Sequence, residues 1–150
     1  MDSLALDKLT YIHIVRIPVE LVLYWLFLSH AVPQLMTFDG RNFDILSGLT
    51  APLLYYLVFI KKQVGYKWLL VWNLICLALL LNIVAIAILS APLPFQQLSF
   101  DQPNRAILYF PFIWLPSCIV PIVFFSHLVA IRYTILHKQE NLNIMTQNAV

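Results

Sequence analysis

The chain has 150 residues, of which 61% are hydrophobic and only 11% are charged. Because soluble domains carry about a quarter charged residues, this composition argues against an ordinary soluble domain and predicts an integral membrane protein, with the lipid bilayer as its surroundings. The net charge is +2 and no basic cluster is dense, so no nucleic-acid partner is expected.

The first predicted membrane helix covers residues 11–32, with the sequence YIHIVRIPVELVLYWLFLSHAV. At a rise of about 1.5 Å per residue it is long enough to cross a hydrocarbon core about 30 Å thick. Residues 1–10 are polar and mixed, and we predict that they form a cytoplasmic N-terminal segment. The region before the most apolar stretch is net acidic where a signal peptide needs positive charge, so no cleavage is expected.

Three further apolar runs follow, each bounded by polar connections. They cover residues 43–60, 68–89 and 106–131. The predicted fold is therefore an all-α integral membrane bundle of four transmembrane helices. The membrane domain spans residues 11–131, and residues 132–150 form a polar C-terminal cytoplasmic tail.

Polar side chains beside these helices are expected to satisfy backbone groups. Asn42 or Asp44 is predicted to cap the second helix, because their side-chain oxygens accept hydrogen bonds from unpaired N–H groups. The fourth helix carries three prolines five residues apart, which free backbone carbonyls. Asn73 and Asn82 lie on opposite faces of the third helix and are predicted to hydrogen-bond to neighbouring helices, including those carbonyls.

The distribution of Lys and Arg predicts the orientation. Six of them fall on the side of the two termini and two on the other side, which by the positive-inside rule places both termini in the cytoplasm. The predicted location is the inner or plasma membrane. The first group is Lys8, Lys61, Lys62, Lys67, Arg132 and Lys138, and the second is Arg41 and Arg105.

A polar stripe on the first helix is the main candidate site. At about 100° per residue, His13, Arg16 and Glu20 share one helix face, running from the cytoplasmic interface towards mid-membrane. Arg16 and Glu20 are four residues apart and can pair. A charge at the centre of a bilayer costs about 2.5–3.5 kcal/mol, so the stripe should face the bundle.

This stripe has two interpretations. The functional one is a binding site for a proton, an ion or an anionic substrate in a small transporter, channel or accessory membrane subunit. The other is a buried pair that fixes helix packing in a structural scaffold. Because a thin bundle would leave the stripe in need of cover, a homo-oligomer or a partner membrane subunit is expected.

Two histidines allow a further alternative. His127 lies near the cytoplasmic end of the fourth helix, at the depth of His13, and two such histidines could ligate a haem iron or another metal in a redox protein. The sequence has no haem-attachment motif and no hydrolase, metalloprotease or phosphate-loop motif. The leading interpretation therefore includes no cofactor and no catalytic residues.

A second group of polar residues should gather on the outer side of the membrane. It forms either an ordinary solvated loop surface or an outer mouth or docking surface. The residues are Asp39, Arg41, Asp44, Asp101 and Arg105.

Three segments carry a resemblance to known sequences. The runs are VRIPVELVLYWLF, FDGRNFDILSGLTAP, and PFQQLSFDQPNR with the following LYFPFIWLP. Over residues 12–131 they resemble small multi-pass bacterial membrane proteins described as hypothetical. The resemblance implies a membrane location, no known activity, and relatives with additional N-terminal spans.

Overall fold

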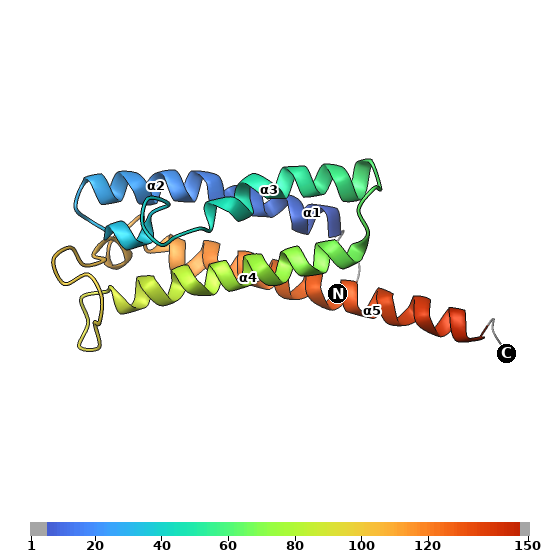
Figure 1. The fold of residues 1–150 in the computed structure, drawn as a ribbon. Coiled ribbons are helices and arrows are strands. Elements are labelled where there is room, and N and C mark those ends of the chain that lie inside the picture. The colour runs from blue at the N-terminus through green and yellow to red at the C-terminus, as the bar shows by residue number, and fades with distance from the viewer. Residues whose placement is uncertain (1–5, 148–150) are drawn as a thin grey trace.

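The computed structural model describes residues 6–147, and within that range the regular structure is entirely helical. The chain makes four antiparallel passes (Figure 1). The main helices are α1 (Leu6–Tyr11), α2 (Arg16–Leu28), α3 (Ile45–Tyr55), α4 (Tyr66–Leu89) and α5 (Val120–Gln147). A 3₁₀ segment, Ile12–Val15, joins α1 to α2, and π-helical turns extend α3 over Tyr56–Ile60 and precede α5 over Leu115–Ile119.

The helices form two layers. The α1–α2 run lies beside α3, and α4 packs along α5 beneath them (Figure 1). The long connections 29–44 and 90–114 gather at one end of the bundle, while the short 61–65 connection lies at the other. The start of α1 and the far end of α5 lie on the side of that short connection (Figure 1).

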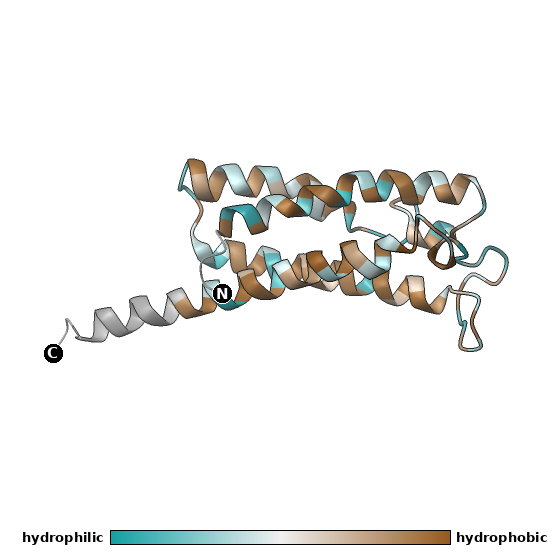
Figure 2. Cartoon of the chain, turned by 180° about the vertical axis from the view of Figure 1, so that it is seen from behind, coloured by the Kyte–Doolittle hydropathy of each residue, from teal (hydrophilic) through white to brown (hydrophobic). Residues whose placement is uncertain are grey.

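Three helical runs are long and apolar enough to cross a membrane: Leu6–Leu28, Tyr66–Leu89 and Leu115–Leu136. Many large apolar side chains are exposed on the helices. Figure 2 shows that hydrophobic residues occur along every pass. Trp25, for example, is 65% exposed, and Leu81 is 51% exposed. Contiguous apolar surface of this kind is unfavourable in water, so it fits a surface that faces lipid.

The predicted boundaries of the first helix, 11–32, were wrong at both ends. The helical run begins at Leu6, because Leu6 is buried with Val58, Leu69 and Ala130 in an apolar cluster at that end of the bundle. It ends at Leu28, and the chain turns at His30, which has a positive φ of 58°. Residues 6–10 are therefore helical and continue the run ahead of the predicted start at residue 11.

The predicted fourth helix, 106–131, was wrong over its first part. Residues 106–108 form a short 3₁₀ turn, the chain then turns again, and the membrane-length run begins at Leu115. Pro111 contributes to this, because it lacks the N–H that a continuous helix needs, while Pro116 lies in the first turn of the run, where that N–H would have no helical partner. At the other end α5 continues to Gln147, into the predicted tail.

The second predicted helix, 43–60, is shorter than a membrane span and begins deep in the structure. Its helical part is Ile45–Ile60. The preceding segment, residues 29–44, folds back along the bundle (Figure 1), and Val32, Met36 and Asn42 within it are buried. As a result α3 begins beside the middle of the α1–α2 run.

Gly48 allows this close approach. A Cβ atom at residue 48 would lie 2.9 Å from Cγ1 of Ile17 and 3.3 Å from Cβ of Arg16. A larger side chain would push α3 away from the start of α2. The glycine therefore fixes the spacing at the level of the polar stripe.

We expect Gly48→Val to lower the free energy of unfolding by about 1–3 kcal/mol, because overpacking forces backbone shifts. The control is Gly65→Val, since an added Cβ there meets nothing within 4 Å. Its loss, from weaker helix capping alone, should be below about 1 kcal/mol. Unfolding in detergent, followed by circular dichroism, measures both. Equal losses would contradict a close contact at Gly48.

Candidate functional site

The polar stripe lies near the middle of the first helical run. Arg16 is ten residues from Leu6 and twelve from Leu28, or about 15 Å and 18 Å along the axis. This is deeper than predicted, because the helix begins earlier. His13, Arg16 and Glu20 are at most 2% exposed, so the stripe does face the bundle interior.

Asp44 is the ion-pair partner of Arg16. Nη1 of Arg16 donates to Oδ1 of Asp44 at 2.5 Å, and also lies 3.4 Å from the carbonyl oxygen of Cys76. The predicted pairing of Arg16 with Glu20 was therefore wrong. Asp44 is 5% exposed, so its predicted place on the outer polar surface was also wrong. The folded-back segment before α3 carries this carboxylate to Arg16.

The second terminal nitrogen of Arg16 contacts His127 of α5. Nη2 lies 2.8 Å from Nε2 of His127. An arginine can only donate, so this His127 nitrogen accepts and the proton of a neutral ring sits on Nδ1. Nδ1 accordingly lies 2.9 Å from Oδ1 of Asn73, whose amide nitrogen donates to the carbonyl oxygen of Leu69. Arg16 thus fixes the tautomer of His127.

His13 stacks on His127 with ring centroids 4.0 Å apart. Ser126 donates its single hydroxyl hydrogen to the carbonyl oxygen of Val123 at 2.8 Å. The 3.3 Å contact between Oγ of Ser126 and Nε2 of His13 is therefore donated by the histidine. Nδ1 of His13 has no hydrogen-bond partner among the described residues.

The structure brings together the two histidines considered as metal ligands. Both ring nitrogens of His127 are engaged in protein hydrogen bonds, and the two rings are nearly parallel, at 19°. Only Nδ1 of His13 has a lone pair without a protein partner. Within residues 6–136, no group of three or more His, Cys, Asp or Glu side chains could hold a metal ion. This geometry favours a hydrogen-bonded network over ligation of haem by both histidines.

Asn42 holds Glu20 from the same folded-back segment. Its Nδ2 donates to Oε1 of Glu20 at 2.5 Å and to the carbonyl oxygen of Met36 at 3.0 Å. Its Oδ1 accepts the backbone N–H of Asp44 at 3.0 Å. This bond from Asp44 to Asn42 closes a turn before the helix, and α3 has no side-chain cap, so the predicted capping by Asn42 or Asp44 was wrong. Oε2 of Glu20 has no partner among the described residues.

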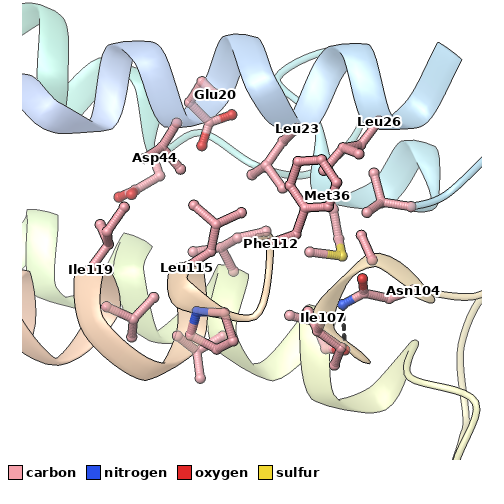
Figure 3. A pocket seen from close by; sticks show the side chains of 18 of the residues that line it. Glu20, Leu23, Leu26, Met36, Asp44, Asn104, Ile107, Phe112, Leu115 and Ile119 are labelled. Atoms are coloured by element: carbon pink, nitrogen blue, oxygen red, sulfur yellow. Dashed lines mark hydrogen bonds between the residues drawn. The ribbon is translucent and has the colours of Figure 1, made fainter. Parts of the chain in front are cut away.

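A cavity of about 280 Å³ begins at this carboxyl group. Figure 3 shows the side chain of Glu20 directed towards it, with apolar side chains of α2 on one wall and Phe112, Leu115 and Ile119 on the other. Figure 3 shows Asp44 near Glu20 and Asn104 at the opposite end, and Arg16, the ion-pair partner of Asp44, also lines the cavity. The cavity is therefore apolar along its length and polar at its ends.

The remaining predicted outer residues lie at the end of the long connections. Asp39, Arg41, Asp101 and Arg105 are exposed. The first three line an open hollow of about 440 Å³, and Arg105 lies outside it. The backbone oxygen of Arg41 accepts a hydrogen bond from Asn82. Asn82 therefore contacts a loop, and Asn73 contacts a histidine. The predicted hydrogen bonds to carbonyls freed by proline were wrong, because the amide nitrogens of Asn82 and Asn73 donate to the carbonyl oxygens of Arg41 and Leu69.

Two contacts were not predicted from the sequence: that of Asn42 with Glu20 and that of Ser126 with His13. Asp44 was predicted on the outer surface and instead pairs with Arg16. One signal could have placed Asp44: it is the carboxylate that directly precedes an apolar run, opposite a buried arginine in need of a counter-charge. Ser126 gave no comparable signal, because a serine beside a histidine is common in helices of any kind.

Asp44→Asn should lower the free energy of unfolding by about 3–5 kcal/mol, because it leaves a buried arginine without its counter-charge. Glu20→Gln should cost about 1 kcal/mol, since the amide oxygen can still accept from Asn42. The double variant Arg16→Met, Asp44→Leu should recover part of the loss of Asp44→Asn. Titration with a denaturing detergent measures all three. A larger loss in Glu20→Gln than in Asp44→Asn would show that Glu20 is the partner of Arg16.

Comparison with curated proteins and with solved structures gives no match to this chain. Residues 2–135 match a family described as a domain of unknown function. That match covers all three membrane-length runs up to residue 135 and every residue of the buried network. The chain belongs to this family, Domain of unknown function (DUF8737).

Proposed function

We propose that the chain is a multi-pass protein of the cell membrane that crosses the bilayer four times. The three membrane-length runs and the exposed apolar side chains support this. The fourth pass is Ile45–Ile60, whose 16 residues rise about 24 Å, less than a core about 30 Å thick. The folded-back residues 29–44 occupy the remaining depth, where their buried polar groups face protein and not lipid.

Both termini lie in the cytoplasm in this proposal. The excess of Lys and Arg on their side supports this orientation. The 61–65 connection then lies on the cytoplasmic side, and the long connections with Asp39 and Asp101 lie outside. The α5 helix carries the chain out of the membrane into the cytoplasm.

Cysteine labelling tests the orientation. In a background with Cys76→Ala and Cys118→Ala, Asp101→Cys should react with a membrane-impermeant maleimide in intact spheroplasts. Lys62→Cys should react only after permeabilisation. The opposite pattern would reverse the orientation, and labelling of both in intact spheroplasts would contradict the membrane topology.

We further propose that the cavity holds a small amphiphilic molecule taken from the membrane, as the binding site of a small transporter or of an accessory membrane subunit. The observation that carries this proposal is an apolar cavity whose end is made by buried charged side chains. An engineered apolar cavity of about 150 Å³ holds benzene, so 280 Å³ has room for a larger apolar body.

The geometry favours this over the other interpretations. An ion or an anion would meet apolar walls, and the charge of Arg16 is already balanced by Asp44. A purely structural bundle gains nothing from an unfilled volume, which in protein cores costs on the order of 20 cal/mol per Å³. A structural role explains the ion-pair network, which holds the helices together. It does not explain the cavity beside that network.

A partner subunit or a homo-oligomer stays a prediction. The oligomer was expected because the polar stripe would otherwise face lipid. In the structure α3, α4 and α5 of the same chain bury the stripe. An oligomer would instead bury the apolar outer faces of the bundle. Cross-linking in native membranes measures it, and recovery of monomers alone would count against it.

Filling the cavity tests the binding site. Ile83 is 8% exposed and lines the cavity, whereas Leu81 on the same helix is 51% exposed on the outer face. Native mass spectrometry of protein purified in mild detergent should show a co-purifying small molecule in the wild type and in Leu81→Trp. Ile83→Trp should lose it while keeping its helical circular dichroism. Retention of the molecule in a folded Ile83→Trp would contradict the proposal.

A further inference from the structure

The polar end of the cavity points to a particular class of ligand, and this inference rests on the proposed binding function. We propose that the ligand is an amphiphile whose polar head is a neutral hydroxyl group, bound between Glu20 and Arg16. The class of ligand follows from the polar atoms of Arg16 and Glu20 that have no hydrogen-bond partner among the described residues.

Most of the hydrogen-bonding capacity of Arg16 is engaged. Nη1 and Nη2 contact Asp44 and His127, while Nε has no partner among the described residues. Glu20 is engaged through Oε1, which accepts from Asn42, while Oε2 is unpartnered within the same range. Both residues are at most 2% exposed. Both residues line the cavity, so its polar end carries an N–H group and a carboxyl oxygen, Nε of Arg16 and Oε2 of Glu20, that have no partner among the described residues.

A hydroxyl group matches this pair. It has one hydrogen to donate and two lone pairs to accept, so it can donate to Oε2 of Glu20 and accept from Nε of Arg16. It also suits Glu20 in either protonation state, because it can accept from a protonated carboxyl as well as donate to an ionised one. Buried polar groups left unmatched carry a desolvation penalty, so this match should dominate selectivity.

Other head groups match less well. A carboxylate or phosphate only accepts, and it would face the carboxyl of Glu20 while Asp44 already neutralises Arg16. An ammonium only donates, so it leaves Nε of Arg16 unmatched and brings two cations together. At the far end, Oδ1 of Asn104 is also unpartnered among the described residues, so a second donor on the ligand would be accepted there.

Photolabelling of the full-length protein in nanodiscs tests this. Three alkyl-diazirine probes of one chain length end in a hydroxyl, an amine or a carboxylate, and mass spectrometry locates the labelled peptides. We expect the hydroxyl probe to label the cavity-lining peptide of α4 about tenfold more than either charged probe, since one hydrogen bond to a charged group is worth about that factor. In Glu20→Met the hydroxyl and carboxylate probes should label it equally, because the carboxyl group that selects between them is gone.

The possible results separate the two proposals. If Ile83→Trp abolishes labelling but the amine or carboxylate probe labels the wild type best, the cavity binds a ligand and the hydroxyl inference is overturned. If no probe labels the cavity above the level in Ile83→Trp, the binding site itself is wrong. A preference for the hydroxyl over the carboxylate probe that survives in folded Glu20→Met would also overturn the inference, since Glu20 would then not be the selecting group.

Discussion

The buried ion pair of Arg16 and Asp44 is the interaction on which the rest of the structure depends. A guanidinium near the middle of an apolar helix needs a counter-charge and partners for its hydrogens. Asp44, His127 and the carbonyl of Cys76 supply them, one each from the start of α3, from α5 and from α4. One side chain of the first helical run therefore contacts the three other passes of the bundle. The folded-back segment 29–44 places the counter-charge, Asp44, beside it.

The network around this pair has a half at His127 and a half at Glu20. Each half keeps one buried atom without a partner among the described residues, Nδ1 of His13 and Oε2 of Glu20, and of these two residues Glu20 is the one that lines the cavity. On the side of His127, each hydrogen bond determines the next, from Arg16 through the ring to Asn73. On the side of Glu20, one carboxyl oxygen is held by Asn42 and the other faces the cavity. The difference separates the part of the stripe that holds helices together from the part available to a ligand.

The sequence predicted the helical class and the shared face of His13, Arg16 and Glu20, because both follow from local periodicity. It did not predict Asp44 as the partner of Arg16, since the four-residue spacing suggested the nearer Glu20 and the true partner is 28 residues away. The helix boundaries failed where tertiary packing decides them: Leu6 is helical because other helices bury it. The cavity could not have been predicted, because it arises from four segments that are distant in sequence.

The short α3 and its inward entry have a consequence for biosynthesis. In a chain that inserts into a bilayer, Arg16 enters with the first helical run, well before His127 has been made. Its carboxylate partner is at the start of the very next pass, so residues 6–60 form a helical hairpin that contains both Arg16 and its counter-charge. Inserted as a pair, the two passes avoid much of the cost that an isolated arginine would incur in lipid. Because Asp44 is synthesised soon after Arg16, the counter-charge is present before the later helices are made.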